Sequence, residues 1–232
     1  MKQVCLREGY RIIQQKGGLG LTQDSVLLAD FLSIAPGERG IELGCGQGGL
    51  WVMALLRHPQ AVLDALELDP LSLEQARENA ARCGLSHRGQ FFQGDAAAFC
   101  PAGFHYDVCL ANPPYAVPGP CSPDARRRLA RSGSPEAFFQ GARRLLGQKG
   151  RFYFCWPARH FFRAAELLQQ NGFSPRQVRF VHGKPGDAAQ LALVMARRGR
   201  GESQFLPPLI LRNESGEYTL EYRRIYGIME EK

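Results

Sequence analysis

The 232-residue sequence lacks several features that would define its class at once. No apolar stretch approaches the roughly 20 residues of a membrane span, and the N-terminus has no apolar core of a secretory signal. The seven cysteines are odd in number and form no Cys-x-x-Cys pair, and the five histidines have no ligand spacing. We therefore expect no membrane span, no disulfide framework and no metal site, and the reducing cytosol is the simplest location.

Charge is distributed unevenly along the chain. Residues 1–121 contain 9 Lys and Arg against 12 Asp and Glu, a net −3, whereas residues 122–232 contain 20 against 10, a net +10. All but three of those 20 basic residues are arginine, whose planar guanidinium fits phosphate and stacks on bases. A basic half of this kind is typical of a polyanion-binding surface. A genome that favours arginine codons would give the same pattern with a merely solvated surface.

Strand and helix patterns alternate through the middle of the chain, which predicts an α/β fold with a parallel sheet and helices on its faces. The predicted strands are 41–43, 61–68, 90–93, 108–111, 152–156, 178–181, 191–196 and 209–211. The predicted helices are 25–32, one beginning near residue 50, 71–83, 135–147 and 158–171. The first 36 residues, a long Pro-, Gly- and Arg-rich loop at 113–133, and the tail from 199 lie outside this alternation.

A glycine-rich turn follows the first predicted sheet strand. Gly44, Gly46 and Gly48 would let the backbone turn tightly and approach a ligand closely. The glycines at 44, 46 and 49 also fit a dinucleotide-binding pattern. However, Glu42 at the strand end would repel a pyrophosphate and attract an ammonium group, such as that of a methionine moiety. A purely structural turn is the remaining alternative.

Acidic residues end the next two predicted strands. Glu67 is placed to accept hydrogen bonds from ribose hydroxyls, and Asp95 from an adenine amino group. Glu67 could instead be an exposed strand-end charge, and Asp95 a cap for a helix at 96–99. Ligands bind at successive strand ends in open α/β sheets, so the two acids and the glycine turn together predict a nucleoside site.

The run Asn112-Pro113-Pro114-Tyr115 follows the strand at 108–111. Two prolines fix the backbone and remove two N–H donors, so the groups that remain are acceptors: the Asn112 side-chain oxygen and the Pro113 carbonyl. Tyr115 adds an aromatic face. Two acceptors and a ring fit a planar group that carries an NH₂, held for reaction with an electrophile. A proline-rich turn with a packed tyrosine is the structural alternative.

These motifs together resemble the class I S-adenosylmethionine (AdoMet)-dependent methyltransferases that act on amino groups. The resemblance implies a doubly wound, Rossmann-like, mostly parallel seven-stranded sheet with an antiparallel terminal strand pair. Flanking runs are similar to those of the bacterial valine-tRNA adenine-N6 methyltransferase family, namely 12–14 through 24–31, Lys184-Pro185 and 218–221. Ala130–Gly133 departs from that family, where an Ala-Arg pair is followed shortly by Glu, and leaves the exact RNA open.

The resemblance implies AdoMet as cofactor and a tRNA adenine beside the anticodon as substrate. It assigns the ammonium to Glu42, the ribose to Glu67 and the adenine of the cofactor to Asp95. Gly44, Gly46 and Gly48 would leave room for the cofactor. Asn112 and Pro113 would orient the substrate amine beside it, Asn112 would also contact the cofactor, and Tyr115 would stack on the base. The expected location is the cytoplasm, with no membrane association and no obligate protein partner.

Three parts of the chain are expected: an N-terminal cap over the cofactor site (1–36), the methyltransferase domain (37–198) and a C-terminal extension on the same domain (199–232). Thr22 and Asp24 are candidates to touch the cofactor, and Asp24 is equally a candidate N-cap of the helix at 25–32. The candidate RNA contacts are Arg126, Arg127, Arg128, Arg223 and Arg224.

Other assignments stay open. The same motif could grip a glutamine amide, which would make the chain a release-factor-type glutamine-N5 methyltransferase, or it could act on an amine in rRNA or DNA. The chain could also be an RNA-binding module with a vestigial cofactor site, although the intact Asn112–Tyr115 run argues against that. A NAD-dependent oxidoreductase is the most distant alternative, because no residue pattern would polarise a hydride acceptor.

Overall fold

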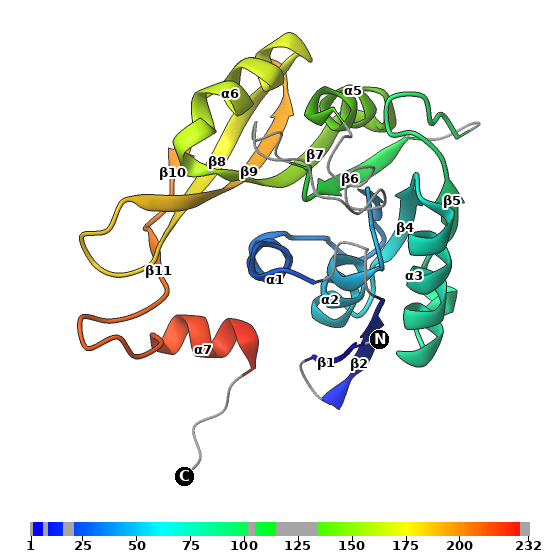
Figure 1. The fold of residues 1–232 in the computed structure, drawn as a ribbon. Coiled ribbons are helices and arrows are strands. Elements are labelled where there is room, and N and C mark those ends of the chain that lie inside the picture. Colours follow the sequence, from blue (N-terminus) through cyan, green and yellow to red (C-terminus); the bar gives the residue numbers. More distant parts are fainter. Residues whose placement is uncertain (1, 7–8, 16–20, 102–104, 115–133, 228–232) are drawn as a thin grey trace.

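A nine-stranded sheet forms the centre of the computed structural model, which describes all residues except 1, 7–8, 16–20, 102–104, 115–133 and 228–232 (Figure 1). Along the sheet the strand order is β10-β8-β9-β7-β6-β3-β4-β5, and β11 also pairs with β8. The strands are β3 (Arg39–Leu43), β4 (Val62–Glu67), β5 (Phe91–Gln93), β6 (Tyr106–Ala111), β7 (Leu146–Pro157), β8 (Phe173–His182), β9 (Ala189–Arg198), β10 (Gln204–Phe205) and β11 (Leu209–Ile210).

The sheet is parallel except at β9, which runs antiparallel to both of its neighbours, β7 and β8. The predicted mostly parallel sheet with an antiparallel pair is thus confirmed. Seven strands make up the predicted sheet, and the two-residue strands β10 and β11 extend it by pairing in parallel with β8. The β7 strand begins at Leu146, earlier than the predicted start at residue 152. Residues 147–151, which are glycine or polar and resemble a loop in composition, belong to the strand.

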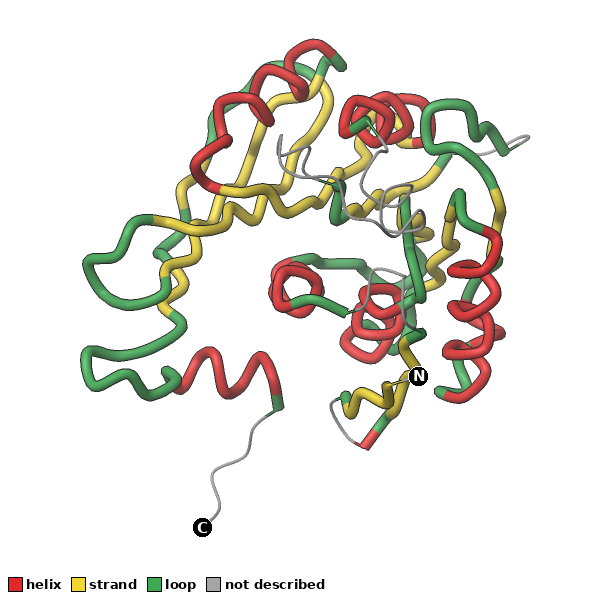
Figure 2. Tube along the Cα trace, in the orientation of Figure 1, coloured by secondary structure: helices red, strands yellow, loops and turns green. Residues whose placement is uncertain are grey.

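Helices cover both faces of the sheet (Figure 2). Buried side chains of α1, α2, α3 and α7 share one apolar cluster, and those of α5 and α6 share the other. The helices are α1 (Gln23–Phe31), α2 (Gly49–Arg57), α3 (Pro70–Arg82), α5 (Pro135–Leu145), α6 (Phe161–Gln170) and α7 (Leu220–Tyr226), with 3-10 turns η2 (Ser86–Arg88) and η3 (Ala158–His160). Among helices of the described ranges, none has the length and apolar character needed to cross a membrane.

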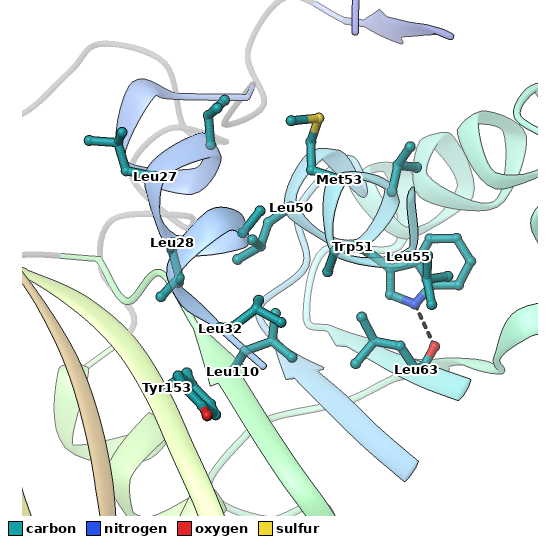
Figure 3. Packing of buried hydrophobic residues seen from close by; sticks show 14 of the residues in the cluster. Leu27, Leu28, Leu32, Leu50, Trp51, Met53, Leu55, Leu63, Leu110 and Tyr153 are labelled. Atoms are coloured by element: carbon teal, nitrogen blue, oxygen red, sulfur yellow. Dashed lines mark hydrogen bonds between the residues drawn. The ribbon is translucent and has the colours of Figure 1, made fainter. Parts of the chain in front are cut away.

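The first apolar cluster joins the N-terminal helix to the sheet. Figure 3 shows Leu28 of α1 and Leu50 of α2 packed in the same layer as Leu110 of β6. Trp51 of α2 is also wholly buried, next to Leu55 in the figure, and its indole N–H donates to the carbonyl of Leu63. Because burial of such side chains supplies most of the stability, α1 is anchored against the central strands rather than merely tethered to them.

Two helix starts show how local sequence set the boundaries. Asp69 caps α3 by accepting from the Ser72 N–H at 3.0 Å, and Pro70 follows at the first helical position, as predicted. Thr22, not Asp24, caps α1, since its hydroxyl accepts from the Ser25 N–H at 3.3 Å. Asp24 therefore lies within the first turn, and its alternative role as the cap is wrong.

The terminal segments pack on the first face. The N-terminal strands β1 (Lys2–Cys5) and β2 (Arg11–Gln14) form an antiparallel hairpin that contacts α3. At the other end, α7 contacts α1, and Gln23 donates to the hydroxyl of Tyr222 at 2.9 Å. The N-terminal hairpin and α7 thus both contribute to the apolar cluster that contains α1.

Candidate functional site

The parallel register brings the predicted motifs to one edge of the sheet. Leu43, the last residue of β3, pairs with Leu66 of β4 and with Ala111 of β6. Gly44 and Asn112 each follow a residue of this row, on neighbouring strands. The glycine turn, Glu67 and the start of the Asn-Pro-Pro run therefore meet where parallel strands end.

The glycine turn adopts backbone angles that favour glycine. Gly44, Gly46 and Gly48 have φ values of +70°, +54° and +80°. The backbone of the turn bonds to the next strand, because the Gly44 N–H donates to the Leu66 carbonyl at 2.8 Å. At Gly48 a Cβ would lie 3.1 Å from the Cβ of Ala76, so the turn also packs closely on α3. The backbone angles thus favour glycine at these three positions, and at Gly48 the close contact with Ala76 also leaves little space for a larger side chain.

Glu42 is buried directly beneath that turn. The residue is 2% exposed, and its Oε2 atom has no hydrogen-bond partner. Burial raises its pKa well above the usual carboxyl range, the negative charge of Glu67 raises it further, and the backbone N–H of Trp51 opposes the shift. A buried acceptor without a partner costs free energy, and a cationic donor at this edge would remove that cost.

Glu67 ends β4 and supports the glycine turn. One carboxylate oxygen accepts from the Gly46 N–H at 2.7 Å, and the other accepts from the N–H groups of Leu68 and Asp69, both at 2.9 Å. Burial raises its pKa despite these three bonds, and the charge of Asp69 adds to the shift. The carboxylate is thus partly buried and held in a fixed orientation, rather than being a loose strand-end charge.

Asp95 follows β5 and caps a turn rather than a helix. Its Oδ1 accepts from the Ala97 N–H at 2.7 Å, and its backbone carbonyl accepts from Ala98 and Phe99. The helix considered at 96–99 is therefore wrong, but the capping role itself is present. The side chain is exposed at the same edge as Glu67, since Glu67 and Gln93 are paired across β4 and β5.

Asn112 directly follows β6 and is bonded to two other elements. Its Nδ2 donates to Ser25 Oγ at 3.1 Å and to Thr22 Oγ1 at 3.3 Å, and its Oδ1 accepts from the Cys155 thiol at 3.1 Å. Pro113, the next residue, is buried. The strand end is thus fixed between the start of α1 and the end of β7.

The predicted RNA contacts are only partly covered by the structure. Tyr115 and Arg126, Arg127 and Arg128 lie outside the described residues. Arg223 and Arg224 are on α7, which contacts α1 and β11, and the first is half-buried and the second exposed.

Several residues that complete the site were missed by the sequence analysis. The Phe138 ring of α5 lies against Gly44, and Leu21 lies against Gly49. Gln47 of the glycine turn exchanges hydrogen bonds with the backbone of Gln15, at 2.9 Å and 3.3 Å. These contacts join distant parts of the chain, and no local pattern marks them.

Metal chemistry finds no support in the described part of the chain, where no group of three or more His, Cys, Asp or Glu side chains could hold an ion. The chemical features of the site are instead a glycine cradle, two buried or half-buried carboxylates and an amide with a proline carbonyl. Such a set can hold a cation and a planar amine.

A parallel sheet with one reversed strand near its edge and a glycine turn after its first strand defines the class I methyltransferase fold. Solved structures agree on the fold. A predicted O-methyltransferase from Agrobacterium tumefaciens has a TM-score of 0.72 at 20% identity, covering 88% of this chain and 96% of its own. Precorrin-6y C5,15-methyltransferase from Geobacter metallireducens has a TM-score of 0.58 at 14% identity, covering 82% and 94%.

Sequence comparison defines the family. The profile of the methyltransferase small domain matches residues 20–174. The tRNA1(Val) (adenine(37)-N6)-methyltransferase of Yersinia enterocolitica is 31% identical over 86% of this chain and 81% of its own length, and that of Tolumonas auensis is 30% identical over 92% and 90%. The chain therefore belongs to the methyltransferase small domain family. Its relatives at 30% identity and above carry the name tRNA1(Val) (adenine(37)-N6)-methyltransferase.

Proposed function

We propose that the chain is an AdoMet-dependent methyltransferase that methylates the N6 amine of an adenine in tRNA, beside the anticodon. One observation carries the proposal: Leu43 and Ala111 are register partners, so the glycine turn and the Asn112-Pro113 acceptors follow adjacent positions of neighbouring strands. A cofactor methyl held over the first would lie next to an amine held by the second.

The residues of this chain fit AdoMet. The left-handed backbone angles of Gly44 and Gly48 would let the turn bring its backbone close to the cofactor, and the unpartnered Oε2 of Glu42 is suited to the cofactor ammonium. Glu67 would take the ribose and Asp95 the adenine. When bound, AdoMet supplies a sulfonium-activated methyl group.

The acceptors then orient the substrate. Asn112 Oδ1 and the Pro113 carbonyl would accept the two hydrogens of the adenine amine and turn its nitrogen lone pair toward the methyl. Bound AdoMet would supply the methyl group to this nitrogen, and the proton that the amine loses would pass to water. Positioning supplies most of the rate, so no strong general base is required. Stacking by Tyr115 stays a prediction.

Two observations support tRNA as the substrate. The relatives at 30% identity and above are named for position 37 of valine tRNA, and the C-terminal half of this chain carries a net charge of +10. The arginines at 126–128, 223 and 224 would contact phosphates and position the anticodon arm. The target base would leave its stack to reach Asn112, as base-modifying enzymes require. A tRNA substrate implies a cytoplasmic location.

The test is transfer of labelled methyl from AdoMet to three acceptors: an unmodified valine tRNA transcript, the same transcript with its anticodon-loop adenines replaced, and a protein release factor. Nucleosides are then analysed for N6-methyladenosine. We expect label in the first acceptor alone. Label in the release factor would support the glutamine alternative and contradict the RNA assignment.

A further inference from the structure

The amide of Asn112 is held by three side chains that lie outside the glycine turn and the Asn-Pro-Pro-Tyr run. Ser25 and Thr22 lie at the start of α1, and Cys155 lies on β7, which is paired to β6 through Ala111 and Phe154. Ser25 and Cys155 are both buried. Buried polar side chains keep a fixed arrangement because every alternative leaves a group unsatisfied.

The two hydroxyls are committed as acceptors toward the amide nitrogen. Thr22 Oγ1 accepts from the Ser25 N–H as the helix cap and also from Asn112 Nδ2. These two bonds use both lone pairs of the Thr22 oxygen. Its own hydrogen is then directed to Ser25 Oγ, 3.2 Å away. Ser25 Oγ therefore also faces Asn112 Nδ2 as an acceptor, at 3.1 Å.

The thiol of Cys155 makes the opposite choice at the other end of the amide. It donates to Asn112 Oδ1 at 3.1 Å, and in a flipped amide the Nδ2 would face the sulfur, which is only a weak acceptor, so this bond would be lost. The surroundings thus distinguish the amide oxygen from the amide nitrogen. Without them the two orientations would be close in energy, as they are for many exposed asparagines.

We propose that Ser25, Thr22 and Cys155 are positioning residues that fix the Asn112 amide so that it meets the substrate amine as an acceptor. The inference rests on the proposed function, in which Asn112 binds that amine. Both Nδ2 hydrogens are occupied by the hydroxyls, so the amide offers only its oxygen to an NH₂ donor. A flipped Asn112 amide would direct its own N–H groups at the N–H groups of the substrate amine. This would disfavour the reactive orientation of the base.

A direct consequence is that the start of α1 takes part in catalysis. Residues 22–25 precede the first strand of the sheet, and α1 is anchored by its own core contacts and by the Gln23–Tyr222 bond. The N-terminal segment would then set the chemistry of the strand-end site in addition to any role in covering the cofactor.

Single-turnover kinetics of Ser25→Ala and Cys155→Ala on valine tRNA test the proposal. We expect each variant to lose about tenfold in the rate of methyl transfer, the value of one well-formed hydrogen bond, with the affinities for tRNA and AdoMet unchanged. Cys155→Ser keeps a donor and is expected to restore the rate. Equal losses in Cys155→Ser and Cys155→Ala would overturn the donor role.

A matched control separates positioning from general stability. Cys83 is another buried thiol, which lies at the C-terminal end of α3 and donates to the Arg11 carbonyl at 3.8 Å. Cys83→Ala is expected to lower the melting temperature to a similar degree as Cys155→Ala without slowing methyl transfer. A similar slowing in both variants would show a stability effect and overturn the proposal.

A double-mutant cycle with Asn112→Ala decides whether Ser25 and Cys155 act through Asn112. In that background, Ser25→Ala and Cys155→Ala should cause no further loss, because the group they position is gone. Full additive losses would overturn the inference while leaving the enzyme a methyltransferase. A wild-type protein that forms no N6-methyladenosine would instead overturn the proposed function, and the inference with it.

Discussion

The ring of Phe138 occupies the space beside Gly44. A Cβ on that glycine would lie 2.7 Å from Phe138 Cε1, closer than real Cβ atoms approach. The contact joins α5 to the glycine turn, although the two residues are far apart in sequence. Gly44 is thus required both for its backbone angle and for the close approach of an aromatic side chain.

Replacement of Gly44 by Ala should therefore weaken the fold and the cofactor site together. The φ of +70° alone is expected to cost about 1 kcal/mol or more, and the clash with Phe138 adds to it. In Gly44→Ala combined with Phe138→Leu, only the clash should be relieved, so the melting temperature should recover in part. Complete recovery would show that the backbone angle is not strained in the variant.

Glu42→Gln tests the assignment of the ammonium. The substitution keeps the shape of the side chain and removes the negative charge, so AdoMet should bind about 10- to 100-fold more weakly, the range for a hydrogen bond to a charged group. Isothermal titration calorimetry measures the affinity. An exposed change at the same sheet edge, such as Gln93→Glu, is the control. If the buried charge of Glu42 is responsible, this control should not weaken AdoMet binding to the same degree. Unchanged affinity would remove Glu42 from the cofactor site.

The raised pKa of Glu42 predicts a pH dependence with a definite sign. The folded protein holds this proton more tightly than the unfolded chain, because burial and the charge of Glu67 disfavour the carboxylate. Its contribution to stability is therefore full below the ordinary carboxyl pKa of about 4.3 and is lost as pH rises through the raised value. Without cofactor, the melting temperature of wild type should fall more steeply over that range than that of Glu42→Gln.

AdoMet affinity should change in the opposite direction over the same range. An ammonium is bound best by the ionised carboxylate, so affinity should rise with pH until Glu42 is fully ionised. Parallel melting curves for wild type and Glu42→Gln, with a flat affinity profile, would contradict both expectations.

Salt dependence tests the RNA surface. Arg224 is exposed on α7, and its replacement by Ala should reduce the slope of log affinity against log salt by about 0.7 to 0.9, the value for one phosphate contact. Arg77 on the acidic half of the chain is also exposed and paired with Glu74, so Arg77→Ala is the control. Equal slopes for wild type and Arg224→Ala would place α7 outside the RNA interface.

Much of the sheet and the strand-end motifs could be predicted because their signals are local. Gly44 and Asn112 stand directly after apolar strands, and parallel pairing then brings them together without further information. The start of α3 is also a local signal, because Asp69 caps the helix and Pro70 follows it at the first helical position.

The surroundings of Asn112 could not be predicted in this way. Its partners Thr22, Ser25 and Cys155 are 90, 87 and 43 residues away in sequence, and a threonine, a serine and a cysteine carry no motif of their own. The cap of α1 was left open by the sequence, because Thr22 and Asp24 both suit a helix start. The structure shows that Thr22 takes this role by accepting from the Ser25 N–H.

Asn112→Ala tests the central claim most directly, with labelled methyl transfer to valine tRNA and AdoMet binding measured on the same preparation. If Asn112 only orients the amine, methyl transfer should fall about 100-fold or more while the AdoMet dissociation constant stays unchanged. A retained rate, or an equal loss of AdoMet binding, would contradict the account.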